Sequence, residues 1–232
     1  MYRYPDPDDE NFNKNIITPE WDDGNLEKLY LEESIKLISP DNRVNFLDAG
    51  CGRGRLLPIF GDIFKRGVAV DPDVKRLQDA IGVTKEFDPK KCAIKFSNVS
   101  VQKFETDETF DCILCSHVIQ HVATNDIAII LKKIRDLLKK SNGKLILSTT
   151  NWKEKDDIFY VIHSLNNKQK VVSQIEFDEC VEQNNDWLPV RYFTERSLRQ
   201  LLENAGFKII FLKKYHGYPR IRGDNFIFAA PE

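Results

Sequence analysis

The stretch FLDAGCGRGR, residues 46–55, decides the fold, because it joins a short apolar segment to a glycine-rich turn. The apolar run at residues 44–49 predicts a buried strand, after which Gly50, Gly52 and Gly54 follow at every second position. A turn of this kind directly after a strand can cradle the pyrophosphate of a dinucleotide, or it can hold a cofactor that has no phosphate. The residues around the glycines distinguish these two cases.

Strand-like and helix-like segments alternate along most of the chain. Strands are predicted at residues 44–49, 68–70, 93–96, 110–115 and 144–148, and helices at 25–38, 55–65, 74–81, 126–140 and 194–205. Strands separated by helices pair in parallel, so we expect an α/β protein with a doubly wound, mostly parallel sheet of seven strands. The last two strands, residues 208–213 and 226–230, have no helix between them and predict a C-terminal antiparallel hairpin.

Two regions depart from this alternation. Residues 1–40 are expected to form an N-terminal lid and a helix, because an acidic, aromatic segment precedes the first amphipathic stretch. Residues 41–232 are expected to form the α/β domain. The polar residues 151–190 interrupt it and predict an insertion that is partly helical.

The composition limits the classes of protein to which the chain can belong. Its 232 residues carry a formal net charge of −2 at pH 7, which gives no electrostatic footprint for nucleic acid or an anionic membrane surface. No apolar stretch approaches the roughly 20 residues of a spanning helix, and the acidic start of the chain is unlike a secretory signal. We therefore expect a soluble, cytoplasmic protein without nucleic-acid or membrane partners.

The five cysteines are an odd number without framework spacing, which fits a reducing compartment. Cys112 and Cys115 form a C-x-x-C pattern inside a predicted strand, whereas a redox pair is expected at the start of a helix. A zinc site would need a second pair of ligands, which the sequence lacks. Core packing is therefore the expected role of this pair, and no metal site is predicted.

The glycine turn does not have the dinucleotide pattern. That pattern, G-x-G-x-x-G, requires a glycine where this chain has Arg55. Asp48, two residues before the first glycine, would repel a nearby pyrophosphate but attract an ammonium group. Asp71 ends the next strand, where a carboxylate can accept hydrogen bonds from ribose hydroxyls. The turn therefore favours a cofactor with a cationic group and a ribose but no phosphate.

Six segments, in this order, resemble the class I S-adenosylmethionine-dependent methyltransferases. They are VNFLDAGCGRGR, GVAVDPD, FSNVSVQKF, FDCILCSHVIQHV, GKLILSTTN and FTERSLRQLLENAGFKII. The C-terminal hairpin fits as well, because that family ends with a strand inserted antiparallel into the sheet. The resemblance implies that S-adenosylmethionine is the cofactor and that residues 41–232 are the domain that binds it.

The resemblance also implies which residues hold the cofactor. Asp48 would lie near the ammonium group, Asp71 would hold the ribose hydroxyls, and Asn98 stands where the family usually has an acid that accepts from the adenine amino group. Asn98 can still accept through its amide oxygen, and Val99 can offer its backbone N–H. The full implied set is Asp48, Gly50, Cys51, Gly52, Gly54, Asp71, Pro72, Asn98, Val99, Ser116 and His117.

The acceptor is expected at the carboxyl ends of the strands. His117 and His121 stand at i and i+4, on one face if that segment is helical, and are candidate bases for a hydroxyl acceptor. The alternatives are that these histidines pack or cap, or, less favoured, that they form a zinc pair. Tyr192 is a candidate contact to the acceptor, and Asn151 and Trp152 are expected at the rim of the pocket.

The hairpin loop offers a cationic cluster, Arg220 and Arg222, with His216 and Tyr218 nearby. Arginine suits planar recognition of a carboxylate or phosphate, so an anionic acceptor is one hypothesis, including a carboxylate that is itself methylated. A carboxylate needs no general base, only orientation and removal of water. A solvated loop tip is the alternative interpretation of the cluster.

Methyl transfer to oxygen, on a small molecule or a carboxylate such as a peptide carboxyl terminus, is the leading functional prediction. The alternatives are methylation of nitrogen or carbon on a small metabolite, and a non-catalytic scaffold with the same fold. Aminopropyl transfer is disfavoured because SHVIQH has no acid to bind a polyamine. Methylation of nucleic-acid bases is disfavoured because the usual N/D-P-P-Y/F tetrapeptide is absent. Nothing in the sequence indicates an oligomeric state.

Overall fold

The computed structural model describes residues 26–232, apart from 86–91, 164–165, 167, 184–185 and 216–222. The strands are β1 (Asn45–Ala49), β2 (Arg66–Val70), β3 (Ala93–Ser97), β4 (Cys112–Ser116), β5 (Lys144–Trp152), β6 (Ile158–His163), β7 (Gln169–Val172), β8 (Trp187–Thr194), β9 (Phe207–Tyr215) and β10 (Asp224–Pro231). The α-helices are α2 (Leu26–Lys36), α3 (Leu57–Ile63), α4 (Val74–Thr84), α5 (Thr124–Leu137), α6 (Gln174–Gln183) and α7 (Glu195–Asn204). The 3-10 helices are η2 (Pro40–Asn42), η3 (Val101–Lys103) and η4 (Ile119–His121).

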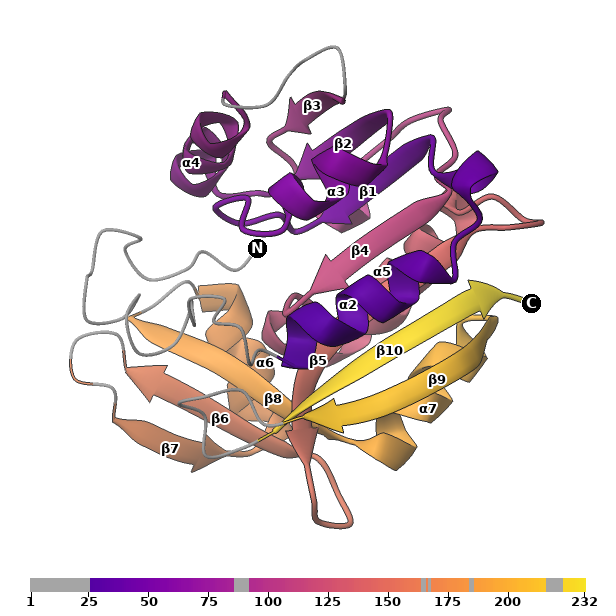
Figure 1. The fold of residues 1–232 in the computed structure, drawn as a ribbon. Helices are drawn as coiled ribbons and strands as arrows, with labels where there is room; N and C mark the ends of the chain where they lie inside the picture. The colour runs from indigo at the N-terminus through magenta and orange to yellow at the C-terminus, as the bar shows by residue number, and fades with distance from the viewer. Residues whose placement is uncertain (1–25, 86–91, 164–165, 167, 184–185, 216–222) are drawn as a thin grey trace.

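The main sheet has the predicted doubly wound arrangement (Figure 1). Strands β3, β2, β1, β4 and β5 lie side by side in that order and pair in parallel. β10 pairs antiparallel with both β5 and β9, so the predicted C-terminal hairpin completes the sheet. The mostly parallel α/β sheet with an antiparallel end is thus confirmed. Because β9 runs in the same direction as β5, its carboxyl end lies at the same edge of the sheet.

The insertion contains more strand than its polar sequence indicates. Helix α6 confirms the expected helical part, but β6, β7 and most of β8 form an antiparallel extension of three strands. β8 joins the main sheet through Asn151 and Trp152 at the end of β5, which makes the connected sheet ten-stranded. The run IFYVIH of β6 is rich in β-branched and aromatic residues, which favour strands over helices.

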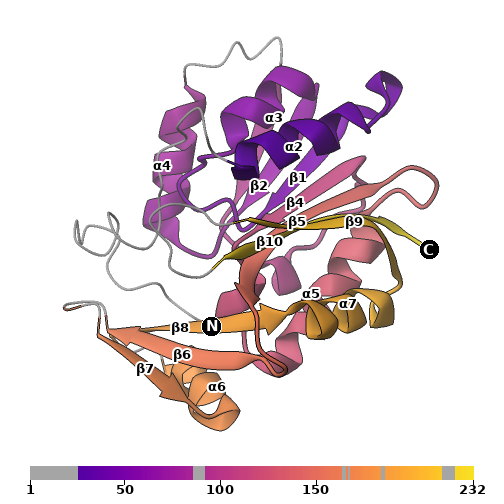
Figure 2. The same ribbon diagram turned by 60° about the horizontal axis from the view of Figure 1, so that its bottom comes forward.

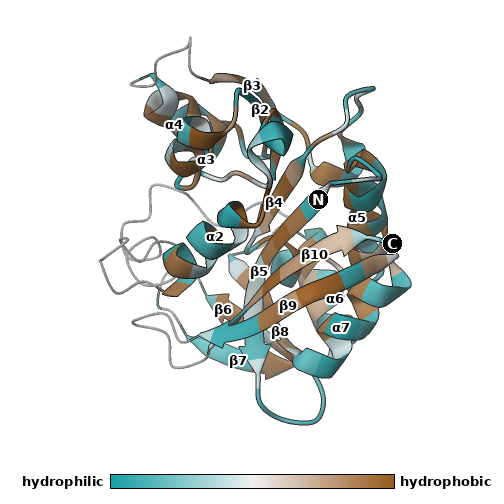
Figure 3. Ribbon diagram, turned by 45° about the vertical axis from the view of Figure 1, so that its right-hand side comes forward, coloured by the Kyte–Doolittle hydropathy of each residue, from teal (hydrophilic) through white to brown (hydrophobic). Residues whose placement is uncertain are grey.

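Two apolar cores lie on opposite faces of the main sheet. One packs α5 and α7 against the strands through residues such as Ile130 and Leu198, and the other packs α2, α3 and α4 through Leu31, Phe60 and Leu77. Figure 2 shows the two layers of helices on either side of the strands. In Figure 3 the hydrophobic colour is concentrated in central strands such as β4, which is buried by helices on both faces. Buried parallel strands of this kind are expected to be apolar throughout.

The strand order reverses between β1 and β4, which places a crevice at their carboxyl ends. Helix α3 begins at Leu57, two positions after the predicted start, because the glycine turn continues that far, and Pro58 lies in its first turn as expected. Cys112 and Cys115 are buried in β4, and this burial raises the pKa of both thiols. Because the strand order reverses there, the crevice at the carboxyl ends of β1 and β4 is where this fold is expected to bind a ligand.

We predict that replacing Gly67 with alanine lowers the free energy of unfolding by about 1–3 kcal/mol, because a Cβ there is overpacked. That Cβ would lie 2.2 Å from the ring of Phe46, its cross-strand partner on β1. The matched control is Gly82→Ala in α4, where a Cβ meets nothing within 4 Å. The control should gain about 0.5–1 kcal/mol from helix propensity. Urea unfolding measures both, and a Gly67→Ala protein as stable as the parent would contradict the packing described here.

Candidate cofactor and acceptor site

The glycine turn after β1 is held in a conformation that only glycine adopts easily. Gly50 has φ of 94° and Gly52 has φ of 53°. A Cβ at Gly50 would lie 2.4 Å from Val118, whereas a Cβ at Gly52 would meet only Arg76, at 4.0 Å. Gly50 is therefore needed for close packing, while the space beside Gly52 is open to the close approach of a ligand.

Asp71 is oriented by two backbone amides at the end of β2. Its Oδ2 accepts from the Gly52 N–H at 2.8 Å and its Oδ1 accepts from the Asp73 N–H at 2.9 Å. Burial raises the pKa of Asp71, and the two amide donors oppose that rise. Each oxygen keeps lone-pair capacity for a further donor, as two ribose hydroxyls require. Pro72 separates Asp71 from Asp73, whose side chain caps α4.

Asp48 lies in β1 and only 3% of its surface is exposed. Burial, followed by repulsion from the Asp71 carboxylate, raises the pKa of Asp48 to about 7, against the lowering effect of Arg55. The carboxyl group is thus close to half protonated at neutral pH. A ligand cation placed beside it would favour the ionised form, which is the chemistry expected of an ammonium site.

The predicted adenine contacts follow β3. The Asn98 amide nitrogen donates to the Asp71 carbonyl at 3.0 Å, which leaves the amide oxygen to accept from an adenine amino group. The Val99 N–H donates to the Ser97 carbonyl at 3.0 Å. Because the turn after β3 uses that N–H, the predicted hydrogen bond from the Val99 N–H to the adenine is not supported in this conformation. The role of Asn98 stays a prediction.

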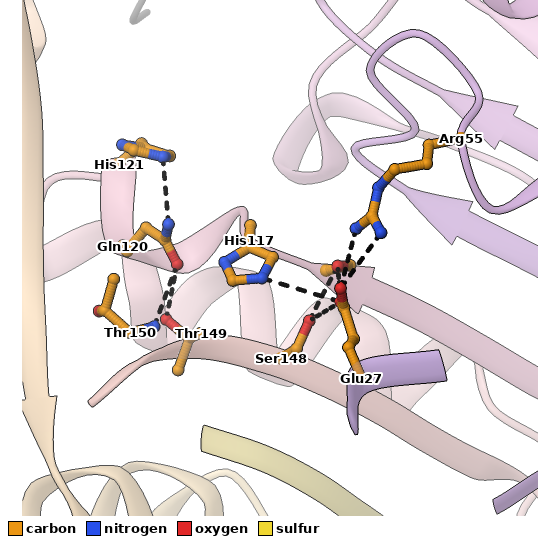
Figure 4. Close-up of polar contacts among 9 residues, drawn as sticks. Glu27, Arg55, His117, Gln120, His121, Ser148, Thr149 and Thr150 are labelled. Carbon is orange, nitrogen blue, oxygen red and sulfur yellow. Dashed lines mark hydrogen bonds and ion pairs between the residues drawn. The ribbon is translucent and has the colours of Figure 1, made fainter. Parts of the chain in front are cut away.

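A buried polar cluster lies at the carboxyl ends of β4 and β5 (Figure 4). Its centre is Glu27 of α2, which is 5% exposed. Glu27 Oε1 lies 3.1 Å from each of the hydroxyls of Ser116 and Ser148, which lie 2.8 Å from each other, so one serine donates to the carboxylate and the other donates to that serine. Glu27 Oε2 accepts from both terminal nitrogens of Arg55 at 3.2 and 3.1 Å. His117 Nε2 lies 3.8 Å from Glu27 Oε1.

Sequence reasoning did not single out Glu27, although a signal was present. Glu27 stands four and eight positions before Leu31 and Ile35, the buried residues of the same helix face. A carboxylate on the apolar face of an amphipathic helix is expected to have buried partners.

Cys51, from the implied cofactor set, is also buried, and burial raises the pKa of its thiol.

His117 and His121 do not share a helical face, which corrects that expectation. His117 has a left-handed φ of 55°, and only the 3-10 turn η4 follows it. His121 Nδ1 lies 2.7 Å from the Pro189 carbonyl, so that nitrogen carries the proton, and Nε2 lies 3.3 Å from the Gln120 amide nitrogen and accepts from it. Both ring nitrogens of His121 are thus engaged: Nδ1 joins η4 to β8, and Nε2 contacts Gln120 within η4. This geometry favours His117 over His121 as a base.

Tyr192 belongs to a group of aromatic side chains on one face of the β-extension. Its ring lies 6.3 Å from that of Trp152 and 5.5 Å, edge to face, from that of Tyr160. We call Trp152, Tyr160 and Tyr192 the aromatic wall. Helix α6 covers the opposite face, where Phe177 packs on Phe159 at 5.1 Å (Figure 2). The aromatic wall begins at the carboxyl end of β5, beside the buried Asn151.

Several predicted elements lie outside the described residues. These are Arg220 and Arg222, with the neighbouring His216 and Tyr218, and the lid that precedes α2. Their predicted roles stay predictions. In the part of the chain that the structure describes, no three histidine, cysteine, aspartate or glutamate side chains gather as metal ligands would. Across the same residues, no helix has both the length and the apolar character that crossing a bilayer requires.

Residues 23–212 match a family described as a methyltransferase domain. The chain is 30% identical over 124 residues to the ubiquinone biosynthesis O-methyltransferase of Rhodopseudomonas palustris (strain TIE-1), a match that covers 53% of this chain and 47% of that protein. The chain thus spans about half the length of the curated relatives it matches.

Solved structures share the fold. The 1,6-didemethyltoxoflavin-N1-methyltransferase of Burkholderia thailandensis, crystallised with S-adenosylhomocysteine, has a TM-score of 0.65 at 18% identity, over 88% of this chain and 76% of that one. An S-adenosylmethionine-dependent methyltransferase from Clostridium acetobutylicum has a TM-score of 0.64 at 12% identity, over 95% and 96% of the two chains. At these identities the likeness concerns the fold.

We predict that S-adenosylhomocysteine binds more weakly below neutral pH, because its ammonium group favours the ionised form of Asp48. With the pKa of Asp48 at about 7 in the free protein, binding should weaken roughly tenfold from pH 8 to pH 6. Calorimetric titration at the two pH values measures this. Asp48→Asn should bind more weakly at pH 8 and show a flatter pH dependence. Equal dissociation constants of the parent at both pH values would rule out this role of Asp48.

Proposed function

Because the chain belongs to the methyltransferase-domain family and has the fold of the class I S-adenosylmethionine-dependent enzymes, we propose that it methylates a hydroxyl oxygen of a small molecule. The observation that carries this proposal is the contact between Gly50 and Val118, the residue after His117. This contact holds the glycine turn, which would carry the methyl donor, against the segment that bears the candidate base.

The residues present fit S-adenosylmethionine. The open space beside Gly52 admits a ligand close to the backbone, and the Asp71 carboxylate is oriented so that it can accept from two ribose hydroxyls. The raised pKa of Asp48 means that a nearby cation would favour its ionised form. When bound, the cofactor supplies a methyl group activated by a sulfonium. Asp48, Gly52, Asp71 and Asn98 would hold it in the crevice between β1 and β4.

The acceptor hydroxyl would meet His117 at the end of β4. His117 would take the hydroxyl proton as the acceptor oxygen is methylated, while the bound cofactor would supply the methyl group and keep the bonding electron pair on its sulfur. In-line displacement depends on alignment and on the exclusion of water, so the fixed position of His117 matters more than strong basicity. The backbone N–H of His117 donates to the Ser148 carbonyl at 2.9 Å, which fixes that position.

The aromatic wall supports a planar acceptor. Aromatic rings stack on, or meet edge to face with, planar ligands, and the phenol of Tyr192 adds a polar handle. The curated relatives are named as O-methyltransferases of ubiquinone biosynthesis, which supports oxygen as the methylated atom. We therefore propose a hydroxylated aromatic ring as the acceptor class. A carboxylate acceptor would depend on Arg220 and Arg222, which the structure does not describe.

The test supplies labelled S-adenosylmethionine with four probe acceptors: 3,4-dihydroxybenzoate, benzoate, a short peptide with a free carboxyl terminus, and a heteroaromatic amine. We expect methyl transfer to a hydroxyl of 3,4-dihydroxybenzoate, identified by mass spectrometry. Transfer only to a carboxylate or only to nitrogen would replace the proposed acceptor class. A protein that binds neither S-adenosylmethionine nor S-adenosylhomocysteine in calorimetry would favour a non-catalytic scaffold.

A matched pair of variants ties the reaction to the aromatic wall. Tyr192→Ala should raise the acceptor KM roughly tenfold with little change in kcat, because it removes a contact that stabilises the bound acceptor and the transition state equally. The control is Ile175→Ala, an exposed residue of α6 on the other side of the extension. It should leave both constants unchanged. An unchanged KM in Tyr192→Ala would remove the aromatic wall from the acceptor site.

A further inference from the structure

The carboxylate of Glu27 is buried at the carboxyl edge of the sheet. Among the described residues its partners come from three other parts of the chain: Arg55 after the glycine turn, Ser116 at the end of β4, and Ser148 in β5. Both terminal nitrogens of Arg55 donate to Oε2, and the two serine hydroxyls, which are hydrogen-bonded to each other at 2.8 Å, supply a donor to Oε1. A buried carboxylate is costly unless it is paired and hydrogen-bonded, and the Arg55 guanidinium favours its ionised form. Glu27 is thus fixed in place.

Attachment of α2 does not require this charge. Leu31 and Ile35 pack into the core beside the main sheet. Further along the same helix, Tyr30 packs edge to face on Tyr215 of β9, and Glu33 pairs with Lys213 of the same strand. A neutral side chain at residue 27 would leave all of these contacts in place. The charge of Glu27 therefore calls for a reason at the site itself.

That reason is found in His117. Its φ of 55° makes it the one non-glycine residue with a left-handed backbone among those that the structure describes. Such a conformation is unfavourable for a residue with a side chain and tends to occur where function requires it. With this backbone, the ring lies with Nε2 at 3.8 Å from Glu27 Oε1 (Figure 4). Among the described residues, the charged groups recorded near the ring are Glu27 from α2 and, on the other oxygen of the same carboxylate, Arg55.

We propose that Glu27 is the positioning residue of His117: it orients the imidazole and stabilises the positive charge that the ring acquires with the acceptor proton. This inference rests on the proposed O-methylation. The proton passes from the acceptor hydroxyl to His117 and leaves the imidazolium beside the Glu27 carboxylate. An opposite charge at this distance favours the protonated ring. The N-terminal helix thus contributes to the reaction without contacting the substrate.

The first experiment needs no acceptor. NMR titration follows the imidazole of His117, assigned with a His117→Gln variant, in the parent, in Glu27→Gln and in Glu27→Asp. Loss of the charge should lower the titration midpoint of His117 by about one pH unit or more, and Glu27→Asp should restore part of the shift. The matched control is Glu33→Gln, which removes a charge from the same helix and should leave the midpoint unchanged.

The second experiment measures transfer to 3,4-dihydroxybenzoate. Glu27→Gln should lower kcat roughly a hundredfold and move the acid limb of the pH profile, which reports the pKa of the base, to lower pH, with acceptor KM and S-adenosylhomocysteine affinity within about twofold of the parent. Arg55→Met, which removes the positive charge on the other oxygen of the carboxylate, should not lower the titration midpoint of His117, because a like charge near the imidazolium is lost. An unchanged midpoint in Glu27→Gln would overturn the proposal even if the enzyme methylates oxygen. If no probe is methylated, the proposed function fails while the titration still decides the role of Glu27.

Discussion

The packing of Val118 against Gly50 is the contact on which the rest of the site depends. It occurs at the point where the strand order reverses, between the carboxyl ends of β1 and β4. No side chain larger than hydrogen fits at residue 50, because a Cβ there would lie 2.4 Å from Val118. The turn that would hold the methyl donor and the segment that carries His117 are therefore held against each other before any ligand binds. Methyl transfer depends on alignment, so such preorganisation contributes directly to the rate.

Glu27, Asp48 and Asp71 are buried carboxylates at this edge, and each has different surroundings. Asp71 accepts from two backbone amides, which oppose the rise in pKa that burial causes. Glu27 is paired with an arginine and with a pair of serine hydroxyls. Among the described residues no hydrogen bond to the Asp48 carboxylate is found, and its pKa is raised to about 7, so a nearby cation would favour its ionised form. These differences assign different work to each: Asp71 suits neutral hydroxyls, Asp48 suits an ammonium group, and Glu27 supports a neighbouring histidine.

The main sheet was predictable from local sequence, because its strands and helices alternate in the apolar pattern. The donor side of the site rests on the glycine spacing and the strand-end acids, and its residue roles stay predictions. The predictions of a strand at residues 44–49 and of an acid at its neighbour's end, Asp71, each use only residues that are adjacent in the sequence. Glu27 was not found, because its partners Ser116 and Ser148 lie 89 and 121 positions away. The left-handed backbone of His117 was also missed, since the i, i+4 spacing with His121 was interpreted only for the case of a helical segment. The β-extension was underestimated because the polar composition of the insertion outweighed the apolar run of β6.

A crystal structure of the protein with S-adenosylhomocysteine is the most direct test of the central claim, that one crevice aligns donor and base. The account predicts that the ribose hydroxyls lie on the Asp71 carboxylate and the ammonium group near Asp48. It also predicts that the sulfur faces the imidazole of His117, with Glu27 still paired to Arg55. A ligand bound elsewhere, or a sulfur facing away from His117, would contradict it.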